Sequence, residues 1–297
     1  MSIREVKPER TFIIAEIGQN HQGDVSMAKA LIREARLCGA DAVKSQKRDI
    51  ASMLTAEEYS RPYDSPHAFA ATYGAHREAL ELSAQDYAEL FEYAQEQEIE
   101  FFSSPWDVES ARLLNDLGMS IFKVPSACLT HLELLEEIAS FGKPMILSTG
   151  MSTLEEVDAA MAAVAGAQVT LMQCTSSYPS SFEAINLRVI PALAARYPEA
   201  VIGFSGHHRG VAVDVAAVAL GARVIERHFT LDRTLKGSDH AASLESPGLS
   251  RLVRDIRACE AALGDGIKRV HAEEEPVKRK LRGERMVTVG KGSRRAA

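Results

Sequence analysis

The feature that most constrains the fold of this chain is a regular alternation of short apolar segments with amphipathic ones. Each apolar segment has the length of a buried strand, and each segment after it repeats its apolar residues at helical spacing. Eight such units occur in the 297 residues, the number that closes a (β/α)8 TIM barrel of the α/β class. An open doubly wound sheet is the competing fold, but it usually carries a glycine-rich phosphate loop after its first strand, and IAEIGQNHQG is not one. The expected strands are TFIIAEIG, ADAVKSQ, EFFSSP, SIFKVPS, PMILSTG, VTLMQCT, VIGFSGH and VIERHFTL.

The helical segments have recognisable ends. Asp24 or Ser26 is placed to cap the first helix, and Gly39 is placed to end it. The helix 211–220 consists almost entirely of Ala, Val and Leu, which predicts that it is buried. The segment 47–83 is too long for a routine connection, so we interpret it as a lid or substrate loop with some helix of its own. The expected helices cover 26–38, 84–97, 108–117, 132–141, 154–164, 187–195, 211–220 and 247–263.

Composition excludes several classes of function. The net charge is −7, which does not favour a nucleic-acid or membrane surface, and no apolar run approaches the ~20 residues of a membrane span. The four cysteines form no CxxC pair and the N-terminal segment is polar, so we expect reduced thiols and a cytoplasmic location. We assign residues 1–270 to the barrel domain and residues 271–297 to a basic, flexible C-terminal tail.

Polar side chains recur where the strands end. In a TIM barrel the carboxyl ends of the strands form the active-site face. A single polar strand end usually reflects turn chemistry, but a set around the whole ring is better explained as a site. The set comprises Glu16, Lys44, Gln46, Ser104, Lys123, Ser126, Ser148, Thr149, Gln173, Thr175, Ser205, His207, Glu226 and His228.

Two histidines end the last two strands. Strand alternation puts Ser205 and His207 on one face, and it puts Glu226 and His228 on one face with Arg227 opposite. If the strands are parallel neighbours, their ends lie about 5 Å apart and the two imidazoles converge. Two imidazoles with a carboxylate nearby suit Mn²⁺, Zn²⁺ or Fe²⁺. The alternative is two histidines satisfied within the protein, which is the better interpretation for a lone histidine.

Two lysines, Lys44 and Lys123, lie inside apolar strands. A buried lysine costs several kcal/mol unless it is paired. Either each forms an internal ion pair with Glu16 or Glu226, or the two clamp an anion. With the nearby serine and threonine hydroxyls they describe a site for a phosphate plus a carboxylate, the two groups of phosphoenolpyruvate.

Long motifs spread over residues 11–245 resemble the sialic acid synthase family, whose members are phosphoenolpyruvate-dependent nonulosonate synthases. The long connection and the last motif look more like the animal-type enzymes, which use a phosphorylated N-acylmannosamine. The motifs are FIIAEIGQNHQGD, GADAVKSQ, FKVPSACLTHLELLE, GKPMILSTGM, LMQCTSSYP, INLRVIPAL, GFSGHHRG, VALGARVIERHFTLD and KGSDHAASLE.

The resemblance implies a cytoplasmic homodimer that condenses phosphoenolpyruvate with the aldehyde of an open-chain N-acylhexosamine and releases phosphate. It implies a divalent metal, with Mn²⁺ favoured over Mg²⁺ or Co²⁺, bound by His207 and His228. Phosphoenolpyruvate is then held by Lys44, Lys123, Ser126, Ser148 and Ser205, with Ser176 near the phosphate. The sugar site is then lined by Glu16, Gln46, Tyr178 and Asp239. We expect the catalytic set to be Glu16, Lys44, Gln46, Lys123, His207 and Glu226, with Ser104, Thr149, Gln173 and Thr175 among the substrate-binding residues.

Three departures from the family pattern keep alternatives open. Cys128 stands where the family carries an Asp or Glu, Ser45 replaces an aromatic residue, and the chain stops within what resembles the linker to a C-terminal antifreeze-like domain. The alternatives are the same chemistry on an unusual aldehyde, or a barrel that binds its ligands without turning them over. At position 128 the sequence leaves open both an altered acceptor and a cysteine that simply packs.

Overall fold

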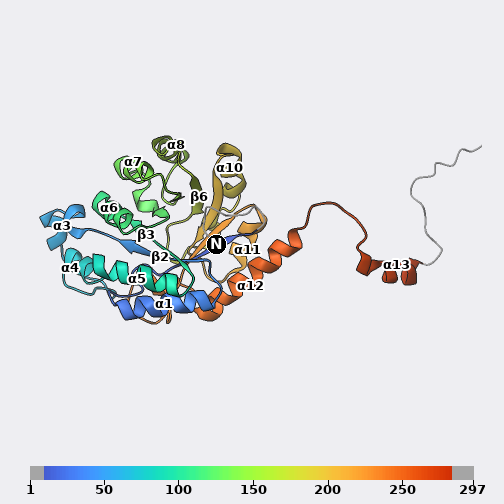
Figure 1. Ribbon diagram of the computed structural model, residues 1–297, viewed down its shortest axis with the longest axis horizontal. Helices are drawn as coiled ribbons and strands as arrows, with labels where there is room; N and C mark the ends of the chain where they lie inside the picture. Colours follow the sequence, from blue (N-terminus) through green and yellow to red (C-terminus); the bar gives the residue numbers. More distant parts are fainter. Residues whose placement is uncertain (1–9, 283–297) are drawn as a thin grey trace, which may run out of the picture. The chain divides into compact units, whose positions relative to one another are not determined.

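The strands form a closed parallel barrel. The computed structural model describes residues 10–282 (Figure 1). Its strands pair in sequence order, with β8 closing onto β1. The predicted (β/α)8 barrel is therefore confirmed. β1 is buried along its whole length, as expected when helices cover the outer face of a parallel sheet. The strands are β1 (Phe12–Glu16), β2 (Ala42–Lys47), β3 (Glu100–Pro105), β4 (Phe122–Val124), β5 (Met145–Ser148), β6 (Val169–Cys174), β7 (Val201–Gly206) and β8 (Val224–His228).

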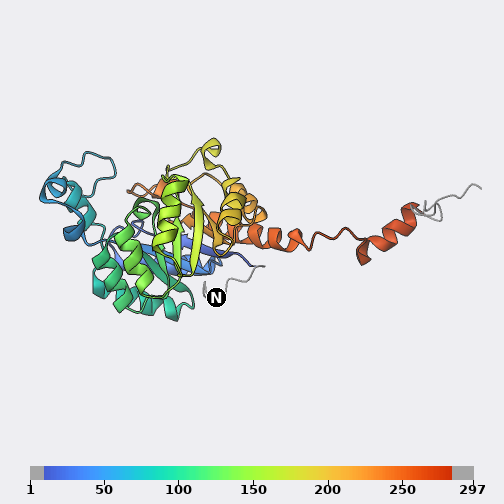
Figure 2. The same cartoon turned by 90° about the horizontal axis from the view of Figure 1, so that it is seen from above.

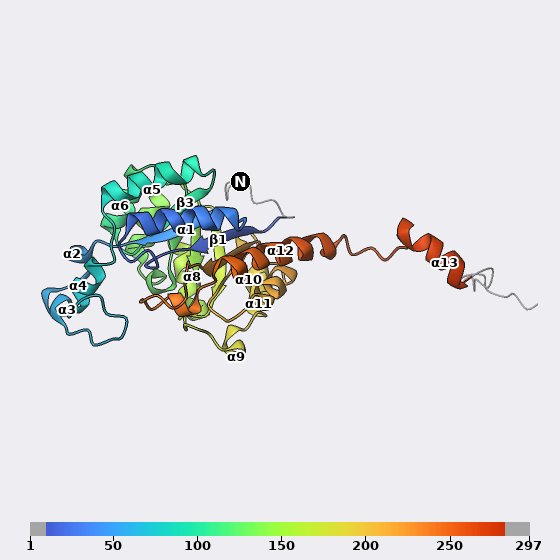
Figure 3. The same cartoon turned by 90° about the horizontal axis from the view of Figure 1, so that it is seen from below.

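A layer of helices surrounds the barrel, each beginning or ending close to where its sequence signals placed it. Asp24 accepts hydrogen bonds from backbone N–H groups in the first turn of α1, and Gly39 follows that helix with a φ of 88°. Figure 3 shows α1 lying beside α5. The helices of this layer are α1 (Val25–Leu37), α5 (Ala84–Glu96), α6 (Val108–Asp116), α7 (Leu132–Ser140), α8 (Leu154–Ala163), α10 (Val189–Arg196), α11 (Ala212–Ala219) and α12 (Ser246–Leu263).

The long connection between β2 and α5 carries short helices, as predicted. They are α2 (Ile50–Met53), α3 (Ala56–Ser60) and α4 (Tyr73–Glu78), and Figure 2 shows this segment set off from the ring of strands and helices. A bridge between Pro62 and Thr72 closes the loop between α3 and α4. A further short helix, α9 (Phe182–Ile185), lies in the connection after β6.

The register of the strands brings their polar ends together. Glu16 of β1 is paired with Lys44 of β2 on one side and with His228 of β8 on the other. On β7 and β8, Ser205 is paired with Glu226. Because all strands run in the same direction, these side chains gather at one end of the barrel.

One expectation about the surface needs correction, and a second, the flexible C-terminal tail, stays a prediction. Helix α11 is not buried throughout: Ala212, Ala216 and Ala219 are exposed, because a helix in the outer layer turns only one face to the strands. The C-terminal tail includes helix α13 (Glu275–Arg282), none of whose residues is buried; the rest of the predicted tail, 283–297, lies outside the described residues. Within residues 10–282, the helices are all too short or too polar to cross a membrane.

Candidate active site

A pocket of about 270 Å³ opens at the end of the barrel where the strands finish. It brings together most of the residues that the sequence analysis proposed. They follow or end seven of the eight strands; the predicted residue of β3, Ser104, is not among them. The predicted residues that line it are Glu16, Lys44, Gln46, Lys123, Ser126, Ser148, Ser176, Tyr178, Ser205, His207, Glu226, His228 and Asp239.

The remaining predicted residues lie outside this lining. Ser104 is directly behind it, where its hydroxyl accepts a hydrogen bond of 2.8 Å from Nζ of Lys44. Thr149, Gln173 and Thr175 instead donate to the carbonyl oxygens of Met172, Ile185 and Ala184. These three side chains therefore hold backbone in place; they line a neighbouring cavity instead, and their substrate-binding role stays a prediction.

Both buried lysines have carboxylate partners. Lys44 forms an ion pair with Glu16, and Nζ of Lys123 lies 3.4 Å from Oε1 of Glu226. Ser205 donates a hydrogen bond of 2.9 Å to the same Glu226 oxygen. The two pairs line the pocket wall, so the ion-pair interpretation and the anion-clamp interpretation of the sequence describe the same residues.

Burial and neighbouring charge act together on these groups. Burial alone would raise the pKa of Glu226, but the ammonium groups of Lys123 and Lys44 outweigh it and lower that pKa to about 2. Burial also lowers the pKa of Lys123, opposed by the charge of Glu226. Glu226 is therefore an anion at neutral pH.

The two histidines converge as predicted. Their ring centroids are 5.3 Å apart, and the ring of Tyr178 lies 4.1 Å from that of His207. Nδ1 of His207 lies 3.1 Å from the carbonyl oxygen of Thr175, which orients the ring and leaves Nε2 for another partner. Burial, followed by the neighbouring His228, lowers the pKa of His207 to about 3, so this imidazole is neutral. Nδ1 of His228 is buried without a hydrogen bond, 3.9 Å from Oδ2 of Asp239.

Another part of the pocket wall presents serine hydroxyls and open space. The Oγ atom of Ser148 is buried without a partner, and Ser126 accepts a hydrogen bond of 3.0 Å from the backbone N–H of Gly150. A Cβ at Gly150 would collide with the hydroxyls of Ser126 and Ser176. The absence of a side chain there keeps a small polar cradle open.

The sequence analysis missed several further pocket residues, among them Gln19, Arg48, Arg77 and Trp106. Gln19, Arg48 and Trp106 follow the ends of β1, β2 and β3 by one to three residues, so extending the strand-end search into the loops would have found them. Arg77 lies on α4, inside the long connection, and only the tertiary structure brings it to the pocket.

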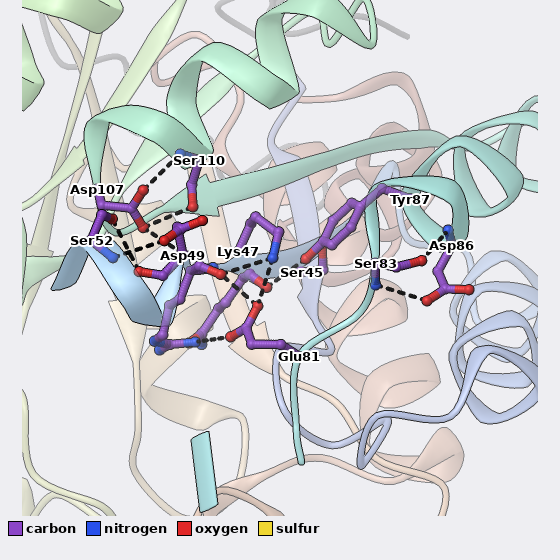
Figure 4. Close-up of polar contacts among 12 residues, drawn as sticks. Ser45, Lys47, Asp49, Ser52, Glu81, Ser83, Asp86, Tyr87, Asp107 and Ser110 are labelled. Atoms are coloured by element: carbon purple, nitrogen blue, oxygen red, sulfur yellow. Dashed lines mark hydrogen bonds and ion pairs between the residues drawn. The ribbon is translucent and has the colours of Figure 1, made fainter. Parts of the chain in front are cut away.

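Two of the departures noted in the sequence have structural explanations. Cys128 is not among the residues that line this pocket; it is 6% exposed, and its thiol lies 3.7 Å from the carbonyl oxygen of Trp106. Burial raises its pKa to about 12, so the thiol is neutral. This favours the interpretation that Cys128 packs. Ser45 faces away from the pocket, 3.4 Å from the hydroxyl of Tyr87 on α5 (Figure 4).

A TIM barrel with a polar pocket at the carboxyl ends of its strands is the arrangement of an enzyme active site. The NeuB family matches residues 31–268, and the chain belongs to this family. It is 46% identical over 261 residues to an N-acetylneuraminate-9-phosphate synthase of Mus musculus, and the aligned region covers 87% of this chain and 73% of that protein. It is 41% identical to an N,N'-diacetyllegionaminic acid synthase of Campylobacter jejuni, over 90% of this chain and 81% of that one. The crystal structure of an N-acetylneuraminic acid synthetase from Leptospira borgpetersenii, in complex with citrate, superposes with a TM-score of 0.81 at 31% identity, over 94% and 93% of the two chains.

The resemblance to the sialic acid synthases is therefore confirmed. The protein is a carbon–carbon bond-forming transferase of the phosphoenolpyruvate-dependent, sialic acid synthase type.

Proposed function

We propose that the protein condenses phosphoenolpyruvate with the aldehyde of an open-chain N-acylhexosamine and water, giving a nonulosonate and inorganic phosphate. The observation that carries the proposal is the joint presence, in one pocket, of two lysine–glutamate pairs, two facing histidines and a cradle of hydroxyls. The names of the relatives, which are synthases of sialic and legionaminic acids, support it.

Phosphoenolpyruvate binds, in this proposal, between the lysines and the cradle. Lys44 and Lys123 supply two positive charges within apolar strands, where they act through a low effective dielectric. The hydroxyls of Ser126, Ser148 and Ser176 and the Gly150 cradle supply neutral donors and space for the phosphate oxygens. Ser205 fixes Glu226 beside Lys123.

The acceptor sugar binds next to it, along Glu16, Gln46, Tyr178 and Asp239. Nε2 of Gln46 donates a hydrogen bond of 3.1 Å to Oε1 of Glu16, which also accepts from the backbone N–H of Gly18. A Cβ at Gly18 would collide with both side chains, so a glycine is required for this approach. The carboxylate is thereby held toward the pocket, where it accepts hydrogen bonds from sugar hydroxyls.

The site also fits a divalent cation, with Mn²⁺ favoured over Mg²⁺ or Co²⁺. The fit rests on two imidazoles that face each other and on the buried, unpaired Nδ1 of His228. The residues 10–282 contain no group of three or more His, Cys, Asp or Glu side chains that could hold a metal, so His207 and His228 would be its protein ligands and substrate or water the others. When bound, the ion supplies Lewis-acid polarisation of the acceptor's carbonyl oxygen.

The direct test is release of inorganic phosphate from phosphoenolpyruvate in the presence of Mn²⁺ and a panel of aldoses, each with and without a 6-phosphate. We expect release only with N-acylated hexosamines, and only before EDTA is added. Phosphate release that is independent of every aldose would refute the proposal, because it would indicate simple hydrolysis.

A further inference from the structure

The outer part of the long connection between β2 and α5 forms a closed loop, residues 61–72, which we call the flap. Its two arms are joined at the base by the bridge between Pro62 and Thr72 and by a hydrogen bond of 2.9 Å from the backbone N–H of Tyr63 to the carbonyl oxygen of Ala71. Beyond this base the flap consists of turns and irregular backbone. Its position therefore depends on the side chains that pack against it.

One side chain beneath the flap, His76 of α4, is bound directly to its backbone. The imidazole is buried, and its Nδ1 accepts a hydrogen bond of 3.1 Å from the backbone N–H of Phe69. The same ring is stacked on that of Tyr63, with the centroids 4.5 Å apart and the planes at 25°. Because a backbone N–H can only donate, this hydrogen bond exists only while Nδ1 carries no proton.

The flap reaches the rim of the active-site pocket through Phe69. Nζ of Lys236, in the loop after β8, lies 5.0 Å from the centroid of the Phe69 ring, which is a cation–π contact. The carbonyl oxygen of Lys236 accepts a hydrogen bond of 3.0 Å from Nε2 of Gln22. Two and three residues after Lys236, Ser238 and Asp239 line the active-site pocket. A short series of contacts thus connects His76 to the pocket rim.

The flap is seated closely on this rim. The cavity between them measures about 10 Å³, which is room for about one water molecule. Gln19, Ser238 and Asp239 line both this cavity and the active-site pocket, so they form a wall that the two share. If the flap moved away, the outer side of this wall would lose its support.

The charges around His76 oppose its protonation. The charged and titratable groups that face it are Arg77 of its own helix, Tyr63 and His67 of the flap, and Lys236 and Asp239 of the loop after β8. Burial lowers the pKa of His76, and the positive charges of Arg77 and Lys236 lower it further. Protonation would add a third positive charge to a group that contains one carboxylate, and it would set two N–H donors against each other.

The direction of the pH effect follows from this shift. With the flap seated, the pKa of His76 lies below the ordinary histidine value of 6.5. With the flap open, the imidazole is exposed to water and its pKa returns toward that value. The open form therefore binds the proton more tightly, so the seated form is favoured above about pH 6.5 and loses ground as the pH falls below it.

We propose that His76 is a pH-sensitive latch, which holds the flap on the pocket rim while its imidazole is neutral and releases the flap when it takes up a proton. Release separates Phe69 from Lys236 and frees the loop that carries Ser238 and Asp239. The inference goes beyond the proposed condensation, because the latch acts whether or not a substrate is bound.

Hydrogen exchange of the full chain, measured by mass spectrometry at pH 7.5 and pH 5.5 and corrected for the intrinsic exchange rate, tests the latch. Protection of the flap should fall by up to about tenfold at the lower pH, the limit for one proton with a pKa of 6.5 in the open form. Protection of α8, which is far from the flap in the sequence, should stay constant. A flap without protection at pH 7.5, an unchanged flap, or an equal loss in α8 would each overturn the proposal.

Two variants of His76 and one control identify the titrating group. In His76→Asn the amide oxygen can replace Nδ1 as the acceptor for Phe69 and does not titrate, so protection should be the same at both pH values. His76→Phe retains the stacking without an acceptor, and its flap should be poorly protected at both. His67→Asn, which removes another histidine from the same cavity, should keep the response of the wild type. The proposal is overturned if either His76 variant still responds to acid or if the control does not.

Exchange and turnover fail independently. An exchange response without turnover of any aldose would refute the proposed function and leave the latch established, and turnover without an exchange response would do the opposite. If both hold, the KM for the acceptor should rise by up to about tenfold from pH 7.5 to pH 5.5 in the wild type relative to His76→Asn. An unchanged ratio would overturn the connection between the latch and the pocket.

Discussion

Two neighbouring residues of β8 belong to two different charged clusters. Glu226 faces the barrel and belongs with Glu16, Lys44 and Lys123 to a mouth cluster that lines the pocket. Arg227 faces the helices, where its Nη1 donates to Asp214 of α11 at 2.5 Å and its Nη2 donates to the carbonyl oxygen of His208 at 2.6 Å.

The difference shows what strand alternation decides. His208, Asp214 and Arg227 form a rear cluster whose side chains are at most 1% exposed, and which joins β7, β8 and α11. Charged residues therefore line the pocket on the inner face of the strand and form a buried cluster on its outer face. Substitutions in the mouth cluster should reduce activity without unfolding the barrel. Substitutions in the rear cluster should lower the free energy of unfolding.

The largest effect should come from the histidines beside the mouth cluster. His207→Ala and His228→Ala should each lower metal-dependent kcat/KM by roughly 10³-fold or more, because the electrostatic support of the reacting carbonyl is lost. The melting temperature should change little, since both residues lie at strand ends. His271→Ala, on the exposed C-terminal segment, is the control. Full activity with unchanged Mn²⁺ affinity in either variant would show that the histidines only pack.

The rear cluster gives the next largest effect, and it is on stability. Asp214→Ala leaves the guanidinium of Arg227 buried without its carboxylate, so the free energy of unfolding should fall by about 3–5 kcal/mol. Urea denaturation measures this. Asp158→Ala, which removes the exposed partner of Arg196, should cost much less. A stable Asp214→Ala protein that had lost turnover would contradict the assignment of this cluster to stability.

Lys123→Met tests the mouth cluster itself. The affinity for phosphoenolpyruvate should fall by about 10- to 100-fold, equivalent to about 1.5–3 kcal/mol for a hydrogen bond to a charged group. Calorimetry measures the affinity, and Lys29→Met, which removes a partly exposed ion pair with Glu89, should leave it unchanged. An unaltered affinity in Lys123→Met would mean that the lysine serves only as the partner of Glu226.

The smallest effect concerns Cys128. Because its pKa is raised to about 12, the thiolate that reacts with alkylating agents is scarce at pH 8 and increases tenfold per pH unit toward that value. Alkylation in the folded protein should therefore be slow and should accelerate as pH rises. Cys128→Ala should change kcat/KM by less than about threefold. A large change in the ratio of rates with different sugars would revive the altered-acceptor interpretation.

The sequence predicted the barrel and most of the pocket because both depend on local patterns. Eight apolar segments fixed the strands, and polar strand ends indicated the pocket. Thr149, Gln173 and Thr175 were chosen for being polar at a strand end, and they alternate with Ser148, Cys174 and Ser176, which line the pocket. Their substrate-binding role stays a prediction. Arg77 could not be predicted, because nothing local to α4 indicates where the long connection folds back.

The central claim, that this pocket forms a carbon–carbon bond, is tested most directly with phosphoenolpyruvate labelled with ¹³C at its vinyl CH₂ carbon. Incubated with the protein, Mn²⁺ and N-acetylmannosamine 6-phosphate, the label should move from the vinyl signal to a methylene carbon of the product, coupled to release of one phosphate per molecule. Label that appears in the methyl group of pyruvate, or that stays in phosphoenolpyruvate with every N-acylhexosamine, would contradict the account.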